Sequence, residues 1–301
     1  MKKNNYSIIN KIYKPYKYTI KNHAMILYCN DRKIVLKEKN DNVKKYHDYM
    51  KISNFDNYLP IVDDNRENFY VYEYKDELYT PREEKERDFI KIVSLLHAKT
   101  TYRKTIDLNT YDEIYNNLEN NINYLKEKYS KMYDDIFPKR YYKPHEYLFM
   151  DYYSKISNNL NFLESEINKW FNLVSNKRNQ RVSLVHNNLD LSHFIKSDND
   201  YLISFDNAKI DTPIIDLVHL YRKMYNVTDY KILLDEYLYH YSLEEEELKL
   251  FFILISIPPD IDLVEDNFTN TKNVYELINY INKVEELIRP YYSNHKEEKK
   301  A

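Results

Sequence analysis

Three short stretches in the second half of the chain decide how this sequence folds: LVHNNLDLSHFI from Leu184 to Ile195, LISFD from Leu202 to Asp206, and DTPIIDL from Asp211 to Leu217. In the first two, β-prone residues alternate with Asn, Asp and Ser, which favour turns. Brief strands are therefore expected over residues 183–186, 193–196 and 201–205. The flanking segments repeat apolar residues at helical spacing, so the pattern predicts a small β insert within a helical region.

Working outward, the first quarter of the chain is predicted to form a separate β-rich part. Short runs rich in Val, Ile and Tyr predict strands over residues 16–20, 24–29, 33–37 and 68–74, with a weak helix over 43–52. From about residue 80 the apolar period changes to that of a helix. We therefore expect a β-rich N-terminal lobe over 1–77, a helical lobe over 78–290 that carries the β insert at 183–206, and a charged tail over 291–301.

The composition suits a globular protein and excludes several functional classes. Of the 301 residues, 43% are hydrophobic and 31% are charged, which allows a substantial core. The net charge of −3 predicts no large cationic face, so nucleic acid is not an expected partner. No run approaches the ~20 apolar residues of a membrane span, and residues 1–10 lack the apolar segment of a secretory signal. Cys29 is the single cysteine and permits no internal disulfide, so a cytoplasmic location is expected.

The chain contains no glycine, whereas average usage of about 7% would give roughly 20. Abundant Asn, Lys, Ile and Tyr, whose codons are AT-rich, favour nucleotide bias as the explanation. The physical consequence is the same whatever the cause. Asn or Asp must occupy left-handed turns, and a glycine-rich nucleotide-binding loop cannot exist here.

The three stretches resemble the catalytic core of aminoglycoside and choline-type phosphotransferases, and more closely that of the CotS-like spore-coat group. In that family the loop has the pattern H-G-D-x-x-x-x-N, a strand ends in I-D, and a helix follows D-x-P-x-x-D-L. The run from Ile34 to Lys37 resembles the strand with the phosphate-binding lysine, and the run from Asn68 to Tyr74 resembles the strand that leads into the hinge. The Leu95-Leu96-His97 helix also fits the family. The resemblance implies an α+β, two-lobed protein-kinase-like fold of the aminoglycoside phosphotransferase type, with a small antiparallel β N-lobe and a larger, mostly helical C-lobe.

The sequence departs from the family at three functional positions. Asn188 stands where the family has its catalytic aspartate, His193 where it has the metal-binding asparagine, and Ser204 where it has the metal-binding aspartate. An amide cannot accept a proton from a hydroxyl nucleophile, and positioned acid–base groups contribute typically about 10²–10⁴-fold to rate. Mg²⁺ prefers hard oxygen ligands in octahedral geometry, which a hydroxyl and an imidazole serve poorly. The three changes together predict negligible ordinary kinase turnover.

Two nearby acids keep an alternative open. Asp190 follows Asn188 by two residues, and Asp206 follows Ser204 by two. In a strand, residues two apart share a face at roughly 6.6 Å, so Asp206 could recruit a metal from a shifted position while Asp190 substitutes as base. The simpler interpretation is a loop hydrogen bond for Asp190 and a solvated acid for Asp206.

The resemblance assigns further roles by position. It implies that Lys37 binds phosphate and that Glu73 and Tyr74 lie beside the nucleotide at the hinge, although Lys37 is equally interpretable as an exposed edge lysine. His186 is expected to brace the loop and Asp216 to anchor it. His97 is expected to pack in a helix.

Two hypotheses of different classes follow. The favoured one is a catalytically impaired pseudokinase that binds a nucleotide or small molecule, or serves as a scaffold for a protein partner. The alternative is an atypical ATP-dependent phosphotransferase that acts on a hydroxyl acceptor with ATP and Mg²⁺ through Asp190 and Asp206.

Overall fold

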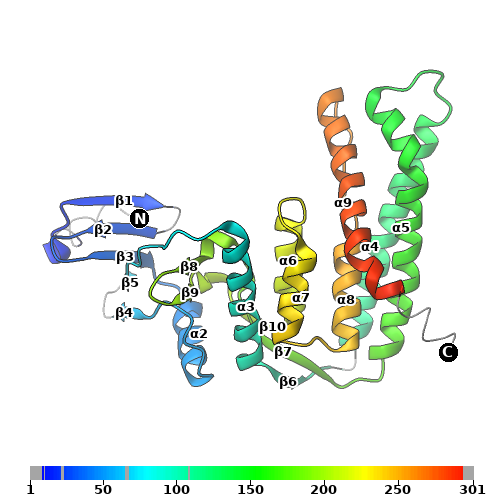
Figure 1. Ribbon diagram of the computed structural model, residues 1–301. Coiled ribbons are helices and arrows are strands. Elements are labelled where there is room, and N and C mark those ends of the chain that lie inside the picture. Colours follow the sequence, from blue (N-terminus) through cyan, green and yellow to red (C-terminus); the bar gives the residue numbers. More distant parts are fainter. Residues whose placement is uncertain (1–8, 10, 22–23, 65–67, 108, 294–301) are drawn as a thin grey trace. The chain divides into compact units, whose positions relative to one another are not determined.

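The computed structural model describes residues 9, 11–21, 24–64, 68–107 and 109–293, so the greater part of the predicted charged tail lies outside it (Figure 1). The chain divides into two compact units, each assembled from several segments. The first comprises residues 1–101, 183–211 and 239–241, and the second comprises residues 102–182, 212–238 and 242–301. The predicted β insert at 183–206 belongs to the first of these units.

The first unit contains a five-stranded antiparallel sheet with strand order β1-β2-β3-β5-β4. Its strands are β1 Lys17–Lys21, β2 Ala24–Tyr28, β3 Lys33–Glu38, β4 Ile61–Asp63 and β5 Phe69–Glu73. The expected turn between β2 and β3 is present, because Cys29 N donates to Arg32 O at 3.0 Å. The sheet confirms the antiparallel β lobe that the sequence predicts, with β4 as an additional edge strand.

Alternation along the strands gives the sheet two buried faces. On one face, Met25, Leu27, Ile34 and Leu36 form a core with Phe69 and neighbouring apolar residues. The opposite face carries a second core, which is formed by Val43, Leu59, Tyr70 and Tyr72. Val43 comes from helix α2 Asp41–Ile52, which therefore covers this second face.

Helix α2 also shows how a chain without glycine ends a helix. Asn54 adopts a left-handed conformation with φ 55° just beyond the helix. Its amide donates to Lys51 O at 3.2 Å, and the amide of Phe55 donates to Met50 O at 3.0 Å. This is the Schellman arrangement, with Asn in the place that glycine usually takes.

The rest of the first unit carries the segment that decided the fold. After helix α3 Arg82–Thr100, the chain returns as the end of β7 Asn179–Val185, which pairs with β10 Lys209–Asp211. Between them lie a 3₁₀ turn η1 Leu191–His193, the hairpin of β8 Phe194–Lys196 and β9 Asp200–Leu202, and a second 3₁₀ turn η2 Phe205–Asn207. The expected strand over 201–205 therefore ends early, at Leu202.

Backbone hydrogen bonds join this segment to the rest of its unit. Leu78 N donates to Lys196 O at 2.8 Å, and Leu202 N donates to Asn57 O at 2.8 Å. In addition, the Leu184 amide donates to the hydroxyl of Thr100 at 3.0 Å. These bonds fix the 183–206 segment against residues that lie at least 84 positions earlier in the chain.

The second unit is mainly helical. Its helices are α4 Thr110–Ile136, α5 Pro144–Val174, α6 Ile214–Met224, most of α7 Tyr230–His240, α8 Glu245–Ser256 and α9 Asn267–Ser293. A short strand, β6 Tyr102–Thr105, pairs with the part of β7 that lies in this unit. Helix α5 packs against α4, α8 and α9, with Trp170 at 1% exposure in its core face. Within the described ranges, none of the helices is both long enough and apolar enough to span a membrane.

Candidate functional site

Lys37 lies at the centre of the candidate site. It is on β3, where it pairs in register with Tyr70 of β5. Its Nζ donates to Asp206 Oδ2 at 3.0 Å and to Ser204 Oγ at 3.1 Å. The Lys37 side chain is 18% exposed and that of Asp206 is 38% exposed. The charge of Lys37 is therefore already balanced by the Asp206 carboxylate, and both side chains are partly buried within the first unit.

The turn after β9 positions both partners of Lys37. Ser204 has φ 71° and ψ 49°, a left-handed conformation that costs an ordinary L-residue roughly 1–2 kcal/mol. This reversal starts η2, on which Asp206 lies, and Asn40 Nδ2 donates to the Asp206 carbonyl at 3.3 Å. The prediction that Ser204 and Asp206 share the face of one strand is thus wrong in its geometry. Both side chains nevertheless reach the same lysine, because the backbone reverses between them.

Helix α2 supports the site from the side of His47. The imidazole is 9% exposed and lies edge-on to Tyr58, Tyr72 and Phe205, at 4.9, 6.2 and 6.3 Å between ring centroids. Burial lowers the pKa of His47 to about 4, against the opposing charges of Asp48 and Asp206. The side chain is consequently neutral at physiological pH and acts as an aromatic packing residue between α2 and η2.

Sequence reasoning missed this support and the partner of Lys37. No glutamate that could pair with Lys37 is present in the sequence of helix α2, and the structure supplies a carboxylate from Asp206 instead. The lysine and the aspartate are 169 positions apart, so spacing along the chain gave no sign that they pair. Asn40 carried a weak signal, since it also caps α2 by accepting from Asn42 N at 2.9 Å.

The loop before β8 holds Asn188, Asp190 and His193. Asp190 caps η1, with Oδ1 accepting from the Ser192 amide at 2.9 Å and from the Ser192 hydroxyl at 2.6 Å. His193 Nδ1 lies 3.0 Å from the Asn188 carbonyl oxygen. Because a carbonyl oxygen can only accept, this nitrogen carries the proton. Asp190 is therefore occupied by the local hydrogen bonds that the simpler interpretation anticipated.

His186 braces the same loop. It is fully buried, and its Nε2 donates to the Ile203 carbonyl at 2.8 Å. Its ring lies 5.5 Å from that of His193 and 5.0 Å from that of Phe205. In addition, the Ile203 amide donates to the His193 carbonyl at 2.9 Å. These contacts tie the loop to the residues that lead into Ser204 and fit the expected bracing role.

Glu73 and Tyr74 are engaged elsewhere. Exposed Glu73 pairs with Lys75 at 3.2 Å, and the Tyr74 ring lies 5.1 Å from Lys33 Nζ. Lys75 in turn binds Asp198 at 3.0 Å. The structure therefore places these two residues at the end of β5 among exposed ion pairs, and it brings together Lys37, Ser204 and Asp206 as a separate cluster.

Two further residues named by the resemblance are buried. Asp216 is fully buried in the first turn of α6, in the second unit. His97 is fully buried on α3, with its ring 6.3 Å from that of Tyr241. The position of His97 agrees with the predicted packing role.

The donor atoms at this site do not fit Mg²⁺. Ser204 offers a neutral hydroxyl, the Nδ1 of His193 donates to a carbonyl, and Asp206 shares its charge with Lys37. Across the residues that the structure describes, no group of three or more His, Cys, Asp or Glu side chains could hold a metal ion. Mg²⁺ would need several oxygen ligands with net negative charge, and one shared carboxylate does not provide them.

Comparison with solved structures defines the class of fold. The chain is similar to an aminoglycoside phosphotransferase from Alicyclobacillus acidocaldarius subsp. acidocaldarius DSM 446, with a TM-score of 0.67 and 10% identity over 94% of this chain and 93% of that one. It is also similar to the AMP-bound complex of a spectinomycin phosphotransferase, with a TM-score of 0.52 and 9% identity over 93% and 97% of the two chains. No protein-family model and no curated protein sequence matches.

The chain thus has the protein-kinase-like fold of the aminoglycoside phosphotransferase type, with a small antiparallel β part and a larger helical part. At such low identity, the likeness establishes the fold alone. The assignment of chemistry rests on the residues around Lys37.

Proposed function

We propose that this kinase-like protein is a catalytically impaired pseudokinase that binds a nucleotide or a related phosphate-bearing metabolite without magnesium. The observation that carries the proposal is the cluster in which Asp206 and Ser204 occupy Lys37. A phosphate group that reaches Lys37 must compete with the Asp206 carboxylate. Binding is therefore weak and does not lead to phosphoryl transfer.

The residues around the cluster support the absence of turnover. Phosphoryl transfer depends on positioning and on neutralising charge with metal ions. Asn188, an amide, stands where the family has its base, and Asp190 is bound to Ser192. The similar spectinomycin phosphotransferase was solved with AMP, which supports a nucleotide as the ligand class. We place the protein in the cytoplasm, since Cys29 is its single cysteine.

The test uses two substitutions with opposite expected effects on ADP binding, measured by calorimetry without divalent metal. Asp206→Asn removes the competing charge and is expected to tighten binding about tenfold, equivalent to ~1.4 kcal/mol. Lys37→Gln removes the phosphate partner and is expected to abolish measurable binding. Asp198→Asn is the matched control, because it neutralises an exposed acid that pairs with Lys75 and is expected to leave ADP affinity unchanged.

Turnover decides the catalytic half of the proposal. The purified protein is expected to consume no ATP above a blank with Mg²⁺ or Mn²⁺. Rapid metal-dependent consumption that Lys37→Gln eliminates would show that the protein is an active enzyme. If ADP affinity were unchanged in both Lys37→Gln and Asp206→Asn, the Lys37 cluster would not be the nucleotide-binding site.

A second candidate, an atypical small-molecule phosphotransferase, is favoured by one observation. The Asp206 carboxylate is 38% exposed and lies beside the lysine that would bind phosphate. If Asp206 recruited a metal ion, ATP consumption would require that metal and the Asp206 carboxylate. Asp190→Asn would also lower the rate of ATP consumption. In the scaffold form of the first proposal, this chain binds a protein partner, and nucleotide binding regulates that interaction.

A further inference from the structure

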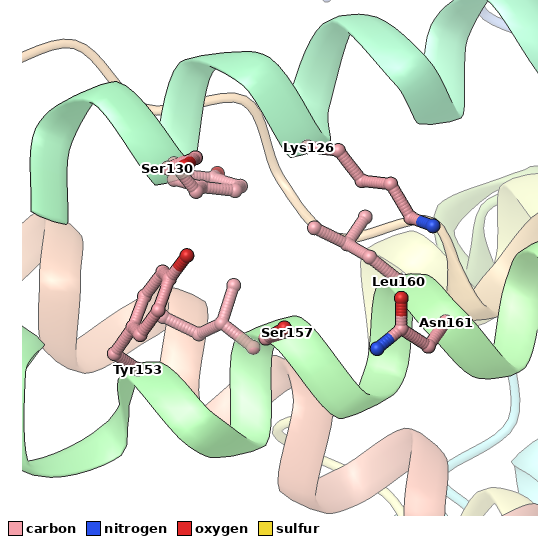
Figure 2. A pocket seen from close by; sticks show the side chains of 8 residues that line it. Lys126, Ser130, Tyr153, Ser157, Leu160 and Asn161 are labelled. Atoms are coloured by element: carbon pink, nitrogen blue, oxygen red, sulfur yellow. The ribbon is translucent and has the colours of Figure 1, made fainter.

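The second unit contains a groove of about 880 Å³ between helices α5 and α9. Figure 2 shows a second hollow, lined by Lys126 of α4 and Tyr153 of α5. Its volume is about 160 Å³. Small-molecule sites usually occupy about 300–1,000 Å³. The α5–α9 groove falls within this range, whereas the α4–α5 hollow is too small. All residues that line the groove come from these two helices, so none of them belongs to the Lys37 site.

The floor of the groove is apolar. Ile281, Val284 and Ile288 of α9 line it and are at most 6% exposed. Phe162 of α5 and Tyr292 of α9 also line it, and their rings meet edge-on at 5.3 Å between centroids. An apolar portion of a ligand would thus find aliphatic and aromatic side chains on both helices.

The buried carboxylate of Glu166 lines the groove and pairs with two lysines. Glu166 is 1% exposed and accepts from Lys169 Nζ at 2.6 Å, Lys249 Nζ at 2.9 Å and the Tyr292 hydroxyl at 2.9 Å. Burial alone raises the pKa of Glu166, but these hydrogen bonds lower it below its ordinary value. The carboxylate is therefore ionised, and two lysines against one glutamate leave this cluster with one net positive charge; Lys169 lines the groove, whereas Lys249 approaches Glu166 from helix α8.

A second cluster on the groove has the same excess. Glu285 pairs with Lys155 at 2.9 Å and with Arg289 at 3.0 Å, again two cations against one carboxylate. Lys155, Glu285 and Arg289 all line the groove. The protein as a whole carries a net charge of −3, so two positive clusters beside one apolar floor are a local feature.

An unpaired acceptor also lines the groove. Asn159 Oδ1 is buried and has no hydrogen-bond partner among the described residues. A buried acceptor without a partner is unfavourable, and a ligand hydroxyl would satisfy it.

We propose that the α5–α9 groove binds an amphiphilic anion, a molecule with a phosphate or carboxylate head and an apolar body. The head pairs with Lys155, Lys169 and Arg289, which line the groove and outnumber Glu166 and Glu285 by one. The body covers Phe162 and the α9 floor. A neutral apolar molecule would leave the cationic excess unused, and a small hydrophilic anion would leave the floor exposed to water.

The experiment measures binding of dodecyl phosphate to the full chain by displacement of anilinonaphthalene sulfonate, a fluorescent aromatic anion. The single tryptophan, Trp170, lies on α5 next to Lys169, so energy transfer from it reports probe bound near this helix. Dodecyl phosphate is expected to displace the probe at least about tenfold more tightly than dodecanol or inorganic phosphate. Equal affinity for dodecanol would show that the cations take no part, and equal affinity for inorganic phosphate would show that the floor takes none. Either result overturns the proposal.

Three variants locate the site. The double change Lys169→Gln with Arg289→Gln is expected to weaken dodecyl phosphate binding by about tenfold or more. Ser165→Phe, at an exposed position that lines the groove, is expected to block the groove without disturbing the core and without adding a second tryptophan. Lys283→Gln is the control, since this lysine is on α9 and pairs with Glu286 but does not line the groove. Unaltered binding in both groove variants overturns the proposal, and neither result bears on ADP binding at Lys37.

Discussion

At the scale of single residues, Ser204 places a neutral hydroxyl beside Lys37 and Asp206. It is held in a left-handed conformation beside Lys37, a conformation that Asp and Asn adopt more readily than Ser. Ser204→Asp would therefore fit the backbone and place a second carboxylate next to Asp206. We expect Mn²⁺ to bind Ser204→Asp at least about tenfold more tightly than the wild type, measured by calorimetry with ADP present.

Ser204→Asn provides the matched comparison, since the amide has the same shape and tolerates the same backbone conformation. It is expected to bind Mn²⁺ no better than the wild type. Equal Mn²⁺ affinity in the Asp and Asn variants would show that charge at residue 204 does not limit metal binding.

The absence of glycine has a measurable cost at Lys14. Lys14 has φ 44°, and the left-handed region costs such a residue about 1–2 kcal/mol. Replacement by glycine loses about 0.4–1 kcal/mol through the greater freedom of the unfolded chain. Lys14→Gly is therefore expected to raise the free energy of unfolding by about 0.5–1 kcal/mol in urea denaturation. Asn54→Gly, at φ 55°, is expected to be close to neutral because Asn tolerates this conformation; a larger gain at Asn54 than at Lys14 would contradict the argument.

At the scale of elements, periodicity predicted the strands and helices that have a clear buried face. The alternation in β2 and β3 and the long apolar repeat of α5 were sufficient to place them within one or two residues. The short strands β4, β6 and β10 were missed, because so few residues carry no measurable period. The equally short β8 and β9 were predicted because a turn-favouring run, residues 197–200, separates them. The early end of β9 could not be foreseen, since the left-handed turn at Ser204 is imposed by tertiary contacts. For the same reason, Lys37 and Asp206 were each identified while their pairing was not.

Helix α2 gives a pH prediction through His47. Burial lowers the pKa of His47 to about 4, whereas an unfolded histidine titrates near 6.5. Between these values the unfolded chain binds a proton that the folded chain does not, so the free energy of unfolding falls as the pH falls. The expected loss from this group is about 2 kcal/mol between pH 7 and pH 5, measured by urea denaturation at each pH.

His47→Phe isolates this contribution, because a phenyl ring can occupy the space between Tyr58, Tyr72 and Phe205 without titrating. It is expected to reduce the difference between pH 7 and pH 5 by about 2 kcal/mol. Tyr58→Phe alters the same cluster but leaves the imidazole and should retain the full difference. An unchanged pH dependence in His47→Phe would mean that folding does not lower the pKa of this histidine.

At the scale of the whole molecule, the two compact units do not follow one another along the chain. The first unit takes residues 183–211 from a region that follows α5, and the candidate site depends on that return. Tyr201 and Ile203 pack against the core formed by Val43 and its neighbours. Phe194 lies 5.8 Å from Phe89 between ring centroids, and both are buried. Residues 1–101 by themselves would expose these surfaces to water.

We therefore expect a fragment of residues 1–101 to lack a cooperative unfolding transition, because removing residues 183–211 uncovers apolar surface on α2, α3 and β5. The same fragment joined through a flexible linker to residues 183–211 is expected to regain a transition in urea, followed by circular dichroism. Amide exchange should then show protection at Leu184 and Leu202, whose amides donate to Thr100 and Asn57. If residues 1–101 alone unfolded cooperatively at the urea midpoint of the linked fragment, residues 183–211 would not contribute to the stability of the first unit. The Lys37–Asp206 pair would then be a contact that the fold of residues 1–101 does not need. If a cooperative unfolding transition appears only in the linked fragment, the segment that carries Asp206 is required for the first unit to fold.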